Sequence, residues 1–152
     1  MPTTTDHLIT LWIASRTRLE NQLDLITADD LKKKLAPSPN SVGYLLQHIA
    51  EVELLFAKNV FGTKDIKIIA HTVIAKKDSG EWTDLKSILS LLNLSRTTLM
   101  TTLHKQQDWN KKIITKEFGT KTKAQALGRI VSHTAYHAGQ LGILLKYGTI
   151  TH

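Results

Sequence analysis

The chain has 152 residues, 41% hydrophobic and 22% charged, which is enough for a single globular domain over residues 1–152 with a buried core. Its formal net charge is +7, and it contains no cysteine. Disulfides, thiolate metal ligands and a cysteine nucleophile are therefore excluded, and a metal ion must be held by nitrogen and oxygen atoms.

The first residues, MPTTTDHLITLW, lack the basic start and the long apolar run of a signal peptide. No stretch approaches the roughly 18 consecutive apolar residues of a membrane-spanning helix. We therefore expect a cytoplasmic protein that does not cross a membrane.

The N-terminal half contains two segments whose apolar residues recur at the spacing of one helix face. The first helix is expected over residues 5–26, and a short helix of one or two turns should follow before Pro37. The second long helix is expected to begin at Asn40 or Ser41, both good N-terminal caps, and to end at Gly62.

The C-terminal half contains two more such segments. One is expected to start after Thr83, and the other to run from about Thr122 to just before Gly148. The intervening connections, residues 62–82 and 107–121, are long enough to cross the end of a bundle instead of forming tight hairpins. The sequence thus predicts an all-α protein, a four-helix bundle with long crossover connections.

The positive charge is concentrated at residues 105–123, which contain six lysines against Asp108 and Glu117. Residues 112–118 (KIITKEF) within it alternate enough to form a short extended piece. A basic patch can bind nucleic acid or a small anion. Because its lysines are scattered and it contains no recognisable nucleic-acid-reading helix, nucleic-acid binding is disfavoured and a solvated surface is the simpler interpretation.

Three histidines lie on the predicted core-facing strips of two helices: His133 and His137 on the fourth, and His48 on the second. Residues four apart have Cβ atoms about 5–6 Å apart, so two imidazoles can reach one metal ion at about 2.0–2.1 Å. Burying three imidazoles costs free energy unless each is ligated or hydrogen-bonded. The pattern is compatible with a metal site and equally with core histidines bonded to backbone carbonyls, and the spacing alone does not decide between them. The histidines without a partner at ligand spacing are expected to be incidental: His7, His71, His104 and His152.

The segments around these histidines, NSVGYLLQHIAEVE (residues 40–53) and HTAYHAGQL (residues 133–141), together resemble the DinB-like metal-binding family, which includes the YfiT-like proteins. The shared pattern is a serine, a histidine and an acidic residue in the first segment, and a histidine pair followed by glycine and glutamine in the second. The matching positions are Ser41, His48, Glu53, His133, His137, Gly139 and Gln140. Two positions depart from the family: Tyr136 and Ala138 stand where it often has histidine and arginine, neither of them a ligand.

The resemblance implies metal ligation by His48, His133 and His137, a DinB-like bundle with crossover connections and, often, a homodimer. Gln140 is expected either to orient a ligand or bound water or simply to pack between helices. Glu53 is expected either to accept a hydrogen bond from a metal ligand or to be a solvated charge.

Glu51 and Gly139 lie close in sequence to the candidate ligands, and their residue types lead to two further expectations. Glu51 is expected at the surface. Gly139 lies in the middle of a predicted helix, where glycine costs about 1 kcal/mol relative to alanine. It therefore suggests either close backbone approach by another helix or a tolerated surface glycine.

Three imidazoles suit zinc, nickel, iron or copper. With the remaining positions open, the ion can lower the pKa of a bound water or thiol, the expected nucleophile. Enzymes of the family use low-molecular-weight thiols, so the resemblance implies a metal-dependent thiol S-transferase of the stress or detoxification type acting on a small molecule. A metal-activated hydrolase is a close variant. A non-catalytic metal-binding stress-response protein is the alternative.

Overall fold

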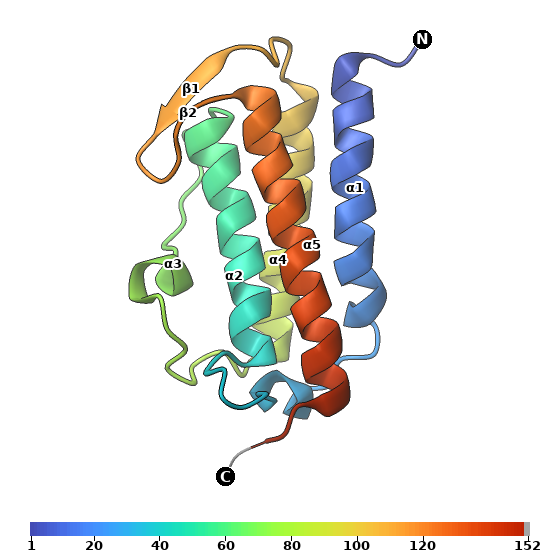
Figure 1. Ribbon diagram of the computed structural model, residues 1–152, viewed down its shortest axis with the longest axis vertical. Helices are drawn as coiled ribbons and strands as arrows, with labels where there is room; N and C mark the ends of the chain where they lie inside the picture. The colour runs from blue at the N-terminus through green and yellow to red at the C-terminus, as the bar shows by residue number, and fades with distance from the viewer. Residues whose placement is uncertain (151–152) are drawn as a thin grey trace.

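A computed structural model, which describes residues 1–150, shows a bundle of four long helices: α1 (Thr4–Leu23), α2 (Val42–Leu55), α4 (Leu85–His104) and α5 (Lys123–Tyr147). In Figure 1 the chain runs one way along α2 and α4 and the opposite way along α1 and α5. Contacts join α1 to α5, α5 to α2, α2 to α4 and α4 to α1, which closes the bundle. The predicted four-helix bundle is confirmed. Within residues 1–150, none of the helices has the length and apolar character to span a membrane.

The starts of the helices follow from side-chain caps. Ser41, one of the two expected caps of α2, accepts a hydrogen bond from a backbone N–H in the first turn of that helix. Thr122 does the same for α5. Thr3 does the same for α1. The helix that was expected to start after Thr83 is capped by the next residue, Asp84, whose side chain accepts a hydrogen bond from the Ser87 backbone N–H.

The connection from α2 to α4 is the one that runs along the bundle. It leaves a π-helical turn, η2 (Phe56–Val60), that continues α2, and it contains the short helix α3 (His71–Ala75). Because this crossover returns the chain to the end where α2 began, α2 and α4 are parallel (Figure 1). The connection from α1 to α2 turns at one end and contains the 3-10 helix η1 (Asp29–Lys32).

The connection from α4 to α5 forms a β-hairpin across the other end of the bundle (Figure 1). Strand β1 (Lys112–Thr115) pairs antiparallel with β2 (Gly119–Thr122), with Ile114 opposite Thr120. The predicted extended piece contains β1. Strand β2 was not predicted, because residues 119–121 have no strand pattern of their own and were placed in the connection.

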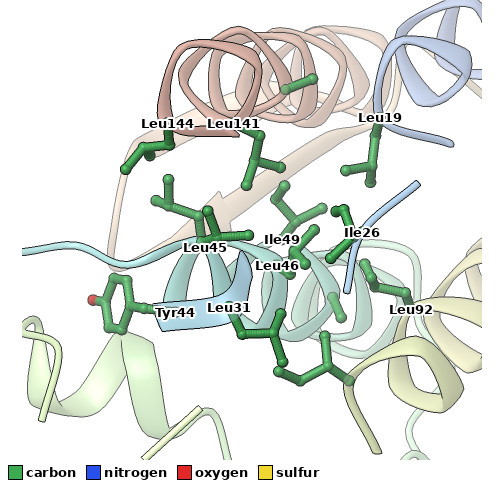
Figure 2. Close-up of a cluster of buried hydrophobic side chains, with 14 residues drawn as sticks. Leu19, Ile26, Leu31, Tyr44, Leu45, Leu46, Ile49, Leu92, Leu141 and Leu144 are labelled. Carbon is green, nitrogen blue, oxygen red and sulfur yellow. The ribbon is translucent and has the colours of Figure 1, made fainter. Parts of the chain in front are cut away.

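The core consists of apolar side chains from all four long helices. Figure 2 shows the cluster in which α2 and α5 face each other, with Leu19 of α1 and Leu92 of α4 beside them. Its members include Leu19, Leu45, Leu46, Ile49, Leu92, Leu141 and Leu144. A second cluster, which includes Trp12, Leu99, Trp109 and Ile130, fills the end beneath the hairpin.

The close backbone approach suggested for Gly139 is wrong. A Cβ added there would meet nothing, because Gly139 is exposed on the outer face of α5. The close approach is at Gly43 of α2, where a Cβ would overlap the backbone carbonyl oxygen of Trp82. Gly43 therefore allows the end of the crossover to pack directly on α2.

Candidate metal centre

The three predicted ligands converge. His133 and His137 lie one turn apart on α5 with ring centroids 4.4 Å apart, and His48 of α2 lies 5.0 and 5.2 Å from them. Nε2 of His48 is 3.0 Å from Nε2 of His133. One ring nitrogen from each residue lies within 4.8 Å of the other two. Two segments that are far apart in sequence thus bring three imidazoles to one point.

All three imidazoles are partly buried, and burial favours their neutral form. Burial, together with the neighbouring His137, lowers the pKa of His48 to about 4. Burial and the other two histidines lower the pKa of His133 to about 3. Burial also lowers the pKa of His137, although its hydrogen bond to Gln140 acts in the opposite direction. The cluster is therefore neutral at pH 7, the state in which imidazole binds metal.

A chain of hydrogen bonds fixes the orientation of His48. Its Nδ1 lies 3.0 Å from the hydroxyl oxygen of Thr72 in α3. That hydroxyl and the Thr72 backbone N–H both donate to the Glu51 carboxylate, which also accepts from Gln47 at 2.9 Å. Because the single hydroxyl proton goes to Glu51, the Thr72 oxygen accepts from His48 Nδ1–H. Nε2 of His48 therefore presents a lone pair toward His133.

Glu51 was expected at the surface, and that expectation is wrong, because its side chain is fully buried at 0% exposure. The sequence contains a signal for its place: 3.6 residues per turn puts a residue three positions after His48 about 60° away on the helix. A residue five positions after His48 is about 140° away. Thr72 had no such signal, because it comes from the crossover.

Glu53 points into the bundle, away from the histidines. Its carboxylate lies 3.4 Å from Nε of Arg16 and accepts a hydrogen bond from Ser95 at 3.2 Å. Within residues 1–150 it forms no hydrogen bond with a histidine. Burial raises the pKa of Glu53 to about 7, while the Arg16 guanidinium acts to lower it. The structure thus gives Glu53 partners on α1 and α4.

The donor atoms fit a divalent metal ion. Gln140 accepts a hydrogen bond from His137 Nδ1 at 2.7 Å, which leaves the other nitrogen of that ring with its lone pair. Two tetrahedral nitrogen ligands at about 2.0–2.1 Å from zinc are about 3.3 Å apart, close to the 3.0 Å between His48 and His133. Nδ1 of His133 is buried without a hydrogen-bond partner among the described residues. Nε2 of His133, which faces His48, is the nitrogen that would ligate the metal ion.

A cavity of about 450 Å³ opens beside His48 and His133. Its walls come from α2 and η2, the crossover, the hairpin and α5. Half of the lining residues are apolar: Val52, Leu55, Phe56, Val60, Val73, Ile114 and Phe118. A small molecule held there would lie against two of the three candidate ligands.

The sequence model of the DinB superfamily matches residues 11–141. The chain belongs to the DinB superfamily. The resemblance found in the two histidine segments is thereby confirmed. No protein of curated function matches this superfamily member.

Among solved structures, a mutant of a mycothiol-dependent maleylpyruvate isomerase has the same fold. Its TM-score to this DinB-superfamily chain is 0.66 at 15% sequence identity, and the match covers 92% of the chain. The chain spans 61% of the length of that structure. At 15% sequence identity, this likeness shows a shared fold and nothing further.

Proposed function

We propose that this DinB-superfamily protein binds one zinc, nickel or iron ion through His48, His133 and His137 and acts as a metal-dependent thiol S-transferase of the stress or detoxification type. The observation that carries the proposal is the convergence of three neutral imidazoles at the edge of a cavity large enough for a small molecule. A low-molecular-weight thiol is the proposed second substrate. The fold shared with a mycothiol-dependent enzyme supports that choice.

A divalent ion at this centre would lower the pKa of a coordinated thiol and so supply a thiolate near neutral pH. The chain's own residues prepare the site. Glu51 and Thr72 hold the His48 ring so that its lone pair faces His133. Gln140 orients the His137 ring in the same way. The apolar cavity would hold an electrophile and exclude water, so that the sulfur attacks carbon and the leaving group departs with the bonding electron pair.

Conjugation assays test this proposal directly. Protein purified without chelator or affinity nickel is expected to conjugate a fluorogenic electrophile such as monochlorobimane when supplied with glutathione or mycothiol. His133→Ala should lose both metal and conjugation. His104→Ala is the matched control, because His104 is exposed at the end of α4. It should retain both.

Metal-loaded protein that conjugates nothing across a broad panel of thiols and electrophiles would overturn the enzymatic proposal. It would favour the alternative, a metal-binding stress-response protein without turnover.

The homodimer and the cytoplasmic location stay predictions. Sedimentation analysis of the purified protein tests the first of them.

A further inference from the structure

We infer that the cavity beside the histidines binds an amphipathic small molecule with an apolar body and one carboxylate, and that Arg129 holds the carboxylate. The inference rests on the proposed function only in assigning this molecule the role of electrophilic substrate. Its binding needs the cavity and Arg129, and no metal ion.

The apolar part follows from the walls of the cavity. Val52 and Phe56 line it from the α2 side, Val73 from the crossover, and Ile114 and Phe118 from the hairpin. Ile114 lines the cavity and is 82% exposed, so the cavity is open to solvent on the hairpin side. A volume of about 450 Å³ lies within the range of about 300–1,000 Å³ for small-molecule sites. These walls fit a ring or a short alkyl chain.

The carboxylate of the proposed ligand is inferred from the charged residues that line the same cavity. Lys116, Glu117 and Arg129 line the cavity, giving one net positive charge. The Arg129 guanidinium lies 4.9 Å from the centroid of the Phe118 ring. Among residues 1–150 it forms neither an ion pair nor a hydrogen bond, since the four ion pairs of that range involve other residues. The contact with the ring leaves its N–H donors available for two parallel hydrogen bonds to a carboxylate.

The position of Arg129 fixes how such a molecule would lie. Arg129 precedes His133 by four residues, one helical turn, or about 6 Å along α5. A carboxylate bound at Arg129 would therefore extend the rest of the molecule along the apolar walls toward His48 and His133. The carboxylate would be separated from the thiol that the proposed function places at the histidines.

Calorimetric titration of the metal-free 152-residue chain tests the inference. The probes are 4-phenylbutyrate and its uncharged analogue 4-phenylbutanamide. We expect saturable binding of the acid and about two- to fivefold weaker binding of the amide, because Arg129 is exposed and solvent weakens its pairing with a carboxylate. Arg129→Gln should weaken the acid by about the same factor and leave the amide unchanged. Arg18→Gln, an exposed arginine on α1, is the matched control and should bind as the wild type does.

A second variant tests the cavity itself. Val52→Trp should fill the space and weaken both probes, with thermal unfolding used to show that the variant is folded. Equal binding of acid and amide, undiminished acid binding by Arg129→Gln, or no saturable binding by folded wild type would each overturn the inference. Acid binding through Arg129 in a protein that conjugates no thiol would sink the proposed function and leave this inference standing.

Discussion

Glu51 and Glu53 lie two positions apart on α2, and both side chains are fully buried. Glu53 faces the bundle core, where a buried arginine on α1 provides the counter-charge. Glu51 faces the histidine side, where its partners are Gln47 and both polar groups of Thr72, and it is linked through Thr72 to His48.

The difference teaches how one helix uses the same residue type for two purposes. A buried carboxylate is costly unless it is paired or hydrogen-bonded. On the core side, the cost is offset by an ion pair that joins α1 to α2. On the site side, it is offset by hydrogen bonds that fix an imidazole. We therefore expect disruption of the first to affect stability, and disruption of the second to affect the metal centre.

Removing the core counter-charge should have the largest effect. Arg16→Met leaves Glu53 without a cation, and breaking a buried pair costs about 3–5 kcal/mol of unfolding free energy.

The size of this loss should depend on pH. The wild-type pKa of about 7 for Glu53 lies above its unfolded value of 4.5, so the folded form holds the proton more tightly and stability falls as pH rises through that interval. Without Arg16 the pKa rises further, so the deficit should grow between pH 6 and pH 9. Urea unfolding at both pH values measures it. An equal deficit at both would contradict this account, as would a loss of metal affinity.

Breaking the site-side chain of hydrogen bonds should weaken metal binding instead. Thr72→Val keeps the side-chain shape but removes the group between Glu51 and His48. Loss of such an outer partner of a ligand lowers metal affinity about 10–100-fold. Zinc titration against a competing chelator measures the change, and Thr72→Ser should restore affinity. If Thr72→Val binds zinc as tightly as wild type, Thr72 does not position His48.

The histidine cluster should also make the metal-free protein sensitive to acid. The folded pKa values of about 4 for His48 and about 3 for His133 lie below the value of 6.5 for a free histidine. As pH falls below 6.5, the unfolded chain takes up protons that the folded form does not, so stability is lost. Each group contributes at most about 1.4 kcal/mol per pH unit. His133→Asn should therefore flatten the dependence of stability on pH between 6.5 and 4.5, whereas His104→Asn should retain the wild-type slope. If wild type and both variants lost stability equally steeply with falling pH, the lowered pKa of His133 would be contradicted.

A substitution beside the site but facing away from it should have the smallest effect. Gly139→Ala should raise stability by about 1 kcal/mol, because alanine is the better helix former and its Cβ meets nothing. Metal affinity should stay unchanged even though His137 and Gln140 are neighbours. Gly43→Ala, where the Cβ overlaps the Trp82 carbonyl, should lower stability. Thermal unfolding of the two variants side by side checks the contrast; a destabilised Gly139→Ala would mean that the outer face of α5 is covered.

The parts of the fold that could be predicted from sequence are those with a local or periodic signal. Apolar periodicity indicated the four helices, and Ser41 and Thr122 indicated two of their starts. The spacing of His133 and His137, with His48 on a matching strip, indicated the cluster. Each of these signals comes from residues within a single helix, so it does not depend on how the helices pack together.

The rest depended on contacts that the sequence does not display. Thr72 lies in a crossover without periodicity, so its place beside His48 could not be read from the chain. Glu53 was preferred to Glu51 because the family pattern was followed in place of the angular position on the helix. Strand β2 is recognisable only by its pairing with β1.

Metal stoichiometry tests the central claim most directly. Elemental analysis of protein purified without chelator or affinity nickel should find one divalent ion per chain. Alanine substitution of any one of His48, His133 and His137 should remove it, and alanine at exposed His7 should not. Unchanged metal content in a variant with all three cluster histidines replaced would contradict the account.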